Sequence, residues 1–182
     1  MKRLLVIFNL IISFVAFGQD LYDIDNITTI EIYFPISSWN SVLNNYQALD
    51  LDDRLMADSV IINGSVKDSV GVKYKGNSTY DVNNAKNPLN IALDYVHENQ
   101  DYQGFRTLKL SNGKKDPSFI REVMSYEIAR KYMQAPKANY AKVFINGNFH
   151  GVYSSVESIN KDFQKDYLFA DRDNTRFKCN PE

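Results

Sequence analysis

The sequence has few of the residue types that build covalent or metal-bound frameworks. It contains one cysteine, Cys179, so no intrachain disulfide can form. Its two histidines, His97 and His150, stand at no ligand spacing from cysteine or carboxylate residues, which argues against a structural zinc site. A net charge of -1 indicates no surface for nucleic acid, and we expect no such partner. Stability must therefore come from an apolar core, for which an aromatic content of 13% provides material.

Long hydrophobic runs are absent except at the start of the chain. Lys2 and Arg3 precede a nearly continuous apolar run over residues 4–17, and small or polar residues follow up to Gln19. This order is typical of a secretory signal peptide, and the run is shorter than the ~20 residues of a membrane span. We predict a signal peptide over residues 1–19, with a single membrane anchor as the alternative. The mature chain, residues 20–182, would then be secreted or extracytoplasmic, at the cell surface or in a periplasm, with no membrane span.

The mature chain is predicted to form one α+β domain, a mostly antiparallel sheet with two helices. Strands are expected where β-branched and aromatic residues alternate, and Asn-Gly turns join two pairs of them. One helix is expected from Trp39 to Tyr46, and the other from Pro117 to Met133 with Asp116 as its cap. The expected strands are residues 27–34, 57–62, 66–74, 89–93, 105–110, 140–145 and 150–156.

The second predicted helix carries a carboxylate at a position where its pattern predicts burial. Glu127, Arg130 and Lys131 form a narrow solvated arc, whereas Glu122 falls among the apolar positions. Because a buried carboxylate usually has a partner, we expect Glu122 to pair with a lysine.

Three lysines could provide that partner. Lys109 is the first candidate, since it lies in the strand that precedes the helix, although a lysine in water at a sheet edge is the alternative. Lys75 and Lys86 could play the same part.

The segment from Gly71 to Thr79, GVKYKGNST, comes close to a phosphate-binding P-loop. A P-loop needs lysine directly after its second glycine and opens a helix, but Asn77 stands there and the segment is itself strand-like. A P-loop nucleotide hydrolase is therefore excluded. Residues 76–79 still form a polar loop with backbone donors suited to an anion, and an ordinary turn is the alternative.

Six segments, in this order, resemble the CotH kinase family, the spore-coat protein H-like secretory atypical protein kinases. They are GVKYKGNST from Gly71, KNPLNI from Lys86, FRTLKLSNG from Phe105, DPSFIRE from Asp116, APKANYA from Ala135 and FINGNFHGVYSSVE from Phe144. The resemblance implies the nucleotide-binding, N-terminal lobe of an atypical protein kinase. It also implies transfer of phosphate from ATP, with Mg²⁺, to Ser or Thr of extracytoplasmic or surface proteins.

The resemblance also implies roles for individual residues. Lys109 and Glu122 would form the ion pair of a kinase lobe, and Lys75, Asn77 and Lys86 would lie near the phosphates. Glu157 would lie on the adenine side.

No residue of this chain is assigned to catalysis or to a metal. In the family those acids come from a larger C-terminal lobe, which we expect to follow Glu182. We therefore expect the chain alone not to catalyse transfer. A non-catalytic binding or surface-structural module on the same scaffold is the alternative.

Overall fold

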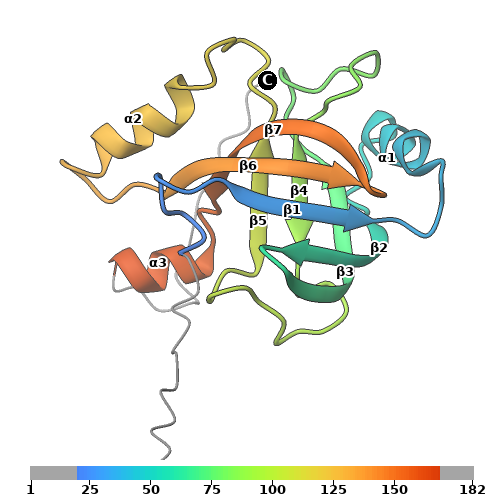
Figure 1. Cartoon of the computed structure of the whole chain (residues 1–182), viewed down its shortest axis with the longest axis horizontal. Coiled ribbons are helices and arrows are strands. Elements are labelled where there is room, and N and C mark those ends of the chain that lie inside the picture. Colours follow the sequence, from blue (N-terminus) through green and yellow to red (C-terminus); the bar gives the residue numbers. More distant parts are fainter. Residues whose placement is uncertain (1–19, 169–182) are drawn as a thin grey trace, which may run out of the picture.

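Seven strands close into a barrel, and three short helices lie outside it (Figure 1). The computed structural model describes residues 20–168. The predicted α+β sheet with two helices, resembling the N-terminal lobe of a kinase, is therefore wrong, because the observed fold is mostly β and its sheet is closed. The strands are β1 Thr28–Tyr33, β2 Leu55–Ile62, β3 Ser65–Tyr74, β4 Leu89–Ala92, β5 Thr107–Ser111, β6 Ala138–Ile145 and β7 Asn148–Glu157.

The barrel closes through a parallel pairing of its first strand. The strand order is β1-β2-β3-β4-β5-β7-β6, and β6 returns to pair with β1 in parallel, whereas the other neighbours are antiparallel. Ile30 of β1 thus lies opposite both Ile62 and Val143. Sequence alternation predicted each of these strands, but it carries no information about which distant strands pair, and so closure was missed.

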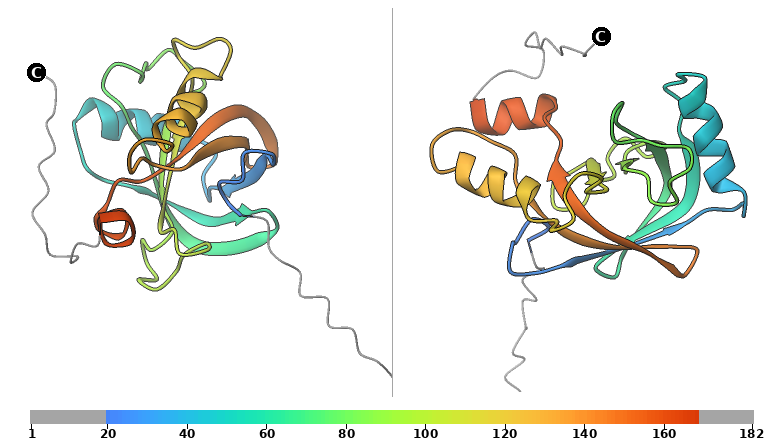
Figure 2. Two further views of the ribbon diagram at one scale, coloured as in Figure 1. Left: turned by 90° about the vertical axis from the view of Figure 1, so that its left-hand side faces the viewer. Right: turned by 90° about the horizontal axis from the view of Figure 1, so that it is seen from above.

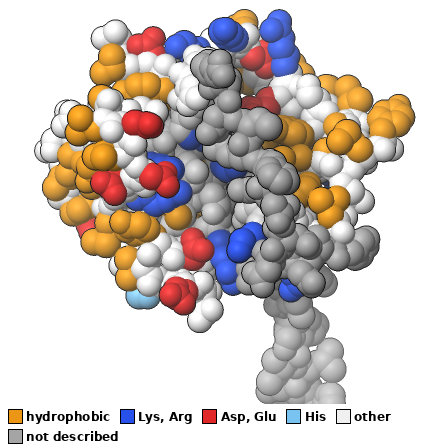
Figure 3. Space-filling view, turned by 180° about the vertical axis from the view of Figure 1, so that it is seen from behind, with side chains coloured by type: hydrophobic (Ala, Val, Ile, Leu, Met, Phe, Trp, Pro, Cys, Tyr) orange, Lys and Arg blue, Asp and Glu red, His pale blue; other side chains and the backbone are white. Residues whose placement is uncertain are grey.

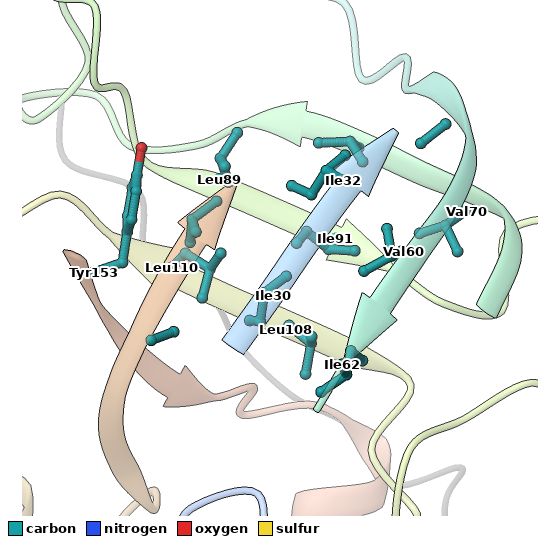
Figure 4. Close-up of a cluster of buried hydrophobic side chains, with 14 of the residues drawn as sticks. Ile30, Ile32, Val60, Ile62, Val70, Leu89, Ile91, Leu108, Leu110 and Tyr153 are labelled. Atoms are coloured by element: carbon teal, nitrogen blue, oxygen red, sulfur yellow. The ribbon is translucent and has the colours of Figure 1, made fainter. Parts of the chain in front are cut away.

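The apolar core fills the interior of the barrel. In β5, Leu108 and Leu110 point inward and are fully buried, whereas Thr107, Lys109 and Ser111 alternate with them on the outer face. Isoleucine, valine and leucine side chains from the other strands meet them (Figure 4). Closure leaves none of the seven strands with a free edge, so the outward lysine of β5 is not an edge guard.

The three helices are α1 Trp39–Ala48, α2 Arg121–Ala129 and α3 Lys161–Leu168. Helix α1 packs on β2 and β3, whereas α2 packs on β6 and β7, and Figure 2 shows α1 and α2 on opposite sides of the barrel. The third helix was not predicted, because its residues are charged and only Phe163 is buried.

Helix α2 is shorter than predicted and begins four residues later than Pro117. Phe119 has a φ of 59°, which interrupts the helical path. The predicted cap is wrong as well, since Ile120 is the N-cap residue and caps the helix with no side chain. The Asp116 carboxylate instead accepts a hydrogen bond from the Arg121 amide at 2.8 Å across the turn that precedes the helix.

The predicted signal peptide, residues 1–19, lies outside the described residues. Within residues 20–168, none of the helices is both long enough and apolar enough to cross a membrane.

Candidate functional site

The outer face of β3, β4 and β5 carries a row of polar side chains. Strand register places Lys73 beside Asn90, and Asn90 beside Lys109. Arg54 adds a further cation, since its guanidinium donates to the Asn90 carbonyl at 3.0 Å and to the Asn90 side chain at 3.2 Å. Lys73 pairs with Asp52. In Figure 3, which shows the molecule from behind, lysine and arginine side chains gather near the middle of the face.

Two of the predicted site residues, Lys75 and Glu122, come together through a serine. The Lys75 ammonium donates a hydrogen bond to Ser111 Oγ at 3.0 Å, and Ser111 Oγ donates to Glu122 Oε1 at 3.1 Å. Lys75 directly follows β3, Ser111 ends β5, and Glu122 lies in the first turn of α2, so three elements converge on one hydroxyl. We call Lys75, Ser111 and Glu122 the lysine–serine–glutamate bridge.

Burial and charge act on Lys75 in opposite directions. Desolvation lowers the pKa of the Lys75 ammonium, because removal from water disfavours the charged form. The nearby Glu122 carboxylate opposes this effect and raises the same pKa. The structure thus supplies Glu122 as the counter-charge of a lysine that would otherwise be poorly solvated.

Two hollows open on either side of this bridge. The first, of ≈ 560 Å³, lies between α1 and the ends of β3 and β4 and is lined by Lys75, Asn77 and Asn90. Its lining also includes three aspartates, Asp50, Asp52 and Asp53. The second, of ≈ 420 Å³, is lined by Ser111 and Glu122 together with Lys114, Lys115 and Arg121. Asn77 is exposed on the loop after β3, as expected for a loop that meets a ligand.

Lys109 lies on the same outer face as the bridge. It is two positions before Ser111 in β5, and its neighbours in register are Asn90 and Val156. The predicted ion pair between Lys109 and Glu122 stays a prediction, while Lys75, named as an alternative partner, contacts Glu122 through Ser111.

Lys86 is held at one end of the barrel by packing. Its ammonium donates to the Asn112 carbonyl at 3.1 Å and lies 4.5 Å and 4.8 Å from the ring centroids of Phe119 and Tyr153. A Cβ on Gly151 would come within 3.2 Å of the lysine stem, so glycine makes room for it. Desolvation lowers the pKa of Lys86. This lysine ties the loop before β4 to the segment after β5.

Glu157 ends β7, three residues after Ser154. It lies opposite the inward-facing Leu108 in register, whereas Ser154 lies opposite Ser111 on the outer face. It is only 6% exposed, and its Oε2 accepts hydrogen bonds from the Lys137 amide at 3.0 Å and the Tyr167 hydroxyl at 3.3 Å. Desolvation raises the pKa of this carboxyl group above its ordinary value. Glu157 lines a cavity of ≈ 80 Å³ between the start of β5 and α3.

Sequence reasoning missed Ser111 and Arg54. Ser111 stood inside the segment FRTLKLSNG and, by strand alternation, on the same face as Lys109, which was the signal that could have identified it. Arg54 precedes a predicted strand without any motif, and only the pairing of β3 with β4 brings Asn90 within its reach.

No cluster of three or more His, Cys, Asp or Glu side chains within residues 20–168 is arranged to hold a metal ion. A comparison with protein-family models matches residues 72–182 to the family described as CotH kinase protein. The matched range contains the bridge, Asn77, Lys86, Lys109 and Glu157, and it begins inside β3. A comparison with curated proteins finds no match.

Proposed function

Because this chain belongs to the CotH kinase protein family, we propose that it binds ATP on the outer face of β3, β4 and β5. The bound nucleotide would serve transfer of its terminal phosphate to Ser or Thr residues of proteins outside the cytoplasm. The lysine–serine–glutamate bridge would lie at the phosphates. The start of β5 would lie on the adenine side. Glu157, predicted on that side from the family resemblance, lies opposite the inward Leu108 and lines the small cavity next to α3, off the outer face.

The bridge is the observation that carries this proposal. Protein kinases hold the nucleotide phosphates with a strand lysine that is fixed by a helix glutamate. Here Lys75 follows a strand and Glu122 begins a helix, with a hydroxyl between their charges. The adjoining hollow supplies Asn77 and the open loop after Gly76, whose φ of 87° turns the backbone there.

The dimensions of the face support an extended ligand. From Thr107 to Ser111, β5 runs about 13 Å at roughly 3.3 Å per residue. Lys109 lies midway along this path on the outer face. A nucleoside triphosphate laid along β5 would therefore meet cationic side chains from its middle to its phosphate end.

Magnesium would enter together with the nucleotide. Mg²⁺ is commonly held by one or two carboxylates plus substrate phosphates, so a preformed protein cage is not required. Asp50 and Asp53 line the hollow next to Lys75, and Glu122 faces the other hollow. When bound, the ion would neutralise charge on the phosphate oxygens, while this chain holds the phosphates with Lys75.

The place of action and the acceptor rest on the sequence and the family. The apolar start of the chain, residues 4–17, supports export, and the family name supports a protein kinase. The acceptor is accordingly proposed to be a protein that this chain meets after export.

The proposal is tested by calorimetric titration of the purified protein with ATP in the presence of Mg²⁺. We expect Lys75→Ala to weaken ATP binding by about 10- to 100-fold, because a hydrogen bond to a charged group is worth ~1.5–3 kcal/mol. Lys142→Ala, an exposed change on the outer face of β6, is the matched control and should leave the affinity unchanged. Incorporation of labelled phosphate into an acceptor protein is a separate test of the transfer, since this chain alone is expected not to catalyse it.

The titration also separates the remaining alternatives. Unchanged affinity in Lys75→Ala would place the phosphates elsewhere, and Lys109→Ala and Lys86→Met then test the other two predicted lysines. Absence of ATP binding by the unmodified protein would leave the non-catalytic binding module as the better description.

A further inference from the structure

The Ser111 hydroxyl occupies a position that neither the fold nor the core requires. It stands on the outer face of β5, with Lys75 on one side and Glu122 on the other. A hydroxyl has one proton and two lone pairs, whereas an ammonium only donates and a carboxylate only accepts. The order of the contacts is therefore fixed: Lys75 donates to Ser111, and Ser111 donates to Glu122.

We propose that Ser111 is a positioning residue, whose hydroxyl couples Lys75 to Glu122 and thereby holds the lysine protonated and aimed at the phosphate site. The coupling itself is a property of the free protein, whereas its consequence for ATP rests on the proposed function. Ser111 need not touch the nucleotide, since it acts through Lys75.

A contact of this kind opposes the effect of burial on the Lys75 ammonium. The ammonium is half-buried, and burial by itself favours the neutral amine. A neutral amine would bind phosphate poorly, because the strong interaction with a phosphate is charge-assisted. A hydroxyl polarised by Glu122 stabilises the ammonium more than a hydroxyl alone, since hydrogen bonds in a chain strengthen one another.

The coupling also depends on the position of helix α2. Glu122 is adjacent to Val123, which is 1% exposed and packs on Ala138 and Val156. Docking of α2 on β6 and β7 thus brings the Glu122 carboxylate to Ser111.

Several other charged groups near the bridge have partners of their own, while Asp50 and Asp53 line the hollow beside Lys75. Lys73 pairs with Asp52, and Lys109 lies further along β5. On the side of Glu122, Lys114 pairs with Asp81 at 3.6 Å and Arg121 pairs with Asp116 at 3.8 Å, while Lys115 lines the same hollow. These charged groups are the same in every variant of Ser111. A difference in the labelling midpoint of Lys75 between such variants therefore comes from the change at Ser111.

The test measures the protonation of Lys75 without any nucleotide. The rate of amine labelling at Lys75 is followed by mass spectrometry as a function of pH, in the unmodified protein and in Ser111→Thr and Ser111→Val. Threonine and valine have the same shape and both suit a strand, so they differ mainly in the hydroxyl. We expect the labelling midpoint of Lys75 to move to lower pH in Ser111→Val and to stay in place in Ser111→Thr.

The change Glu122→Gln tests whether the Glu122 carboxylate acts on the Lys75 ammonium through Ser111. We expect this change to lower the midpoint as Ser111→Val does, and the double variant to lower it no further than the larger single effect. An unchanged midpoint in Ser111→Val, with a lowered one in Glu122→Gln, would overturn the proposal, because Glu122 would then act on Lys75 directly.

ATP titration supplies the second readout. We expect Ser111→Val to weaken ATP binding about tenfold and Ser111→Thr to retain it, as for loss of one charge-assisted hydrogen bond. If the unmodified protein binds no ATP, the proposed function fails, while the labelling midpoints still decide the coupling. If ATP binds equally well to both variants, Ser111 does not position Lys75 for the nucleotide.

Discussion

Two ionisable side chains, the half-buried Lys75 and the buried Glu157, respond in opposite directions to removal from water. Desolvation lowers the pKa of the lysine and raises the pKa of the glutamate, since each change favours the neutral form. Lys75 has the Glu122 charge close by, whereas the contacts of Glu157 are mainly hydrogen bonds from the Lys137 amide and the Tyr167 hydroxyl. Buried charge in this barrel therefore carries a cost that depends on pH.

Glu157 gives a prediction at the residue scale. Its pKa is raised in the folded protein above the unfolded value near 4.5, so the folded state binds the proton more tightly. Its contribution to stability is therefore fully present below the unfolded pKa and is lost as pH rises through the folded pKa. We expect Glu157→Gln to remove this loss and to become relatively more stable than the unmodified protein with rising pH, by on the order of 1 kcal/mol per unit of pKa difference.

The measurement is the free energy of unfolding by urea at a series of pH values above 4. Glu98→Gln, which changes an exposed glutamate between β4 and β5, is the control. A stability difference between Glu157→Gln and the unmodified protein that stays constant with pH would contradict the prediction.

At the scale of elements, α2 carries apolar side chains on its exposed side as well as on its buried side. Its buried side rests on a small cluster of Val123 with Ala138 and Val156, flanked by Tyr126 and Tyr140. Its outer side carries Ile120, Met124 and Ile128, each 50% exposed, at a spacing of four residues. The predicted solvated arc of charges therefore covers only part of the exposed side of α2. Helical phase alone predicted burial for the three apolar residues of this row, and that prediction is wrong.

This exposed apolar row gives a prediction for the isolated chain. We expect self-association at high concentration, because contiguous exposed apolar side chains favour contact with other surfaces. The double change Met124→Gln and Ile128→Gln should raise the monomer fraction in size-exclusion chromatography and alter the unfolding free energy by only about 0.5 kcal/mol. In contrast, Val123→Ala, one position away but 1% exposed, should destabilise by about 1–3 kcal/mol. A monomeric unmodified chain at all concentrations would refute the association.

At the scale of the whole molecule, the barrel is held closed by the pairing of β1 with β6. Ile30 is fully buried at this seam, opposite Val143 on one side and Ile62 on the other. The seam joins the start of the described chain to its second half, so residues before the family match complete the barrel on which the site stands.

We therefore expect Ile30→Ala to destabilise the entire barrel and not β1 alone. The loss should be about 2–5 kcal/mol, as for large-to-small changes in a core. Hydrogen exchange should show reduced protection in β4 and β5, on the other side of the barrel, as well as in β1, if all strands unfold as one unit. Lys142→Ala, an exposed change on β6 beside the same seam, serves as the control. Reduced protection confined to β1 and β6 would show that closure is a local event.

The sequence by itself determined the local structure and named candidate residues for the site. Alternation in each strand and the Asn-Gly turns depend on neighbours along the chain, and each lies where it was predicted within a few residues. Glu122 was selected from the sequence because a charge in a patterned element needs a partner, with Lys109 as its first candidate partner and Lys75 as an alternative. Only the tertiary structure decided the closed barrel and the placing of Ser111 between Lys75 and Glu122. Both depend on which distant strands pair, and the free energy that selects such a pairing comes from long-range packing that no local pattern records.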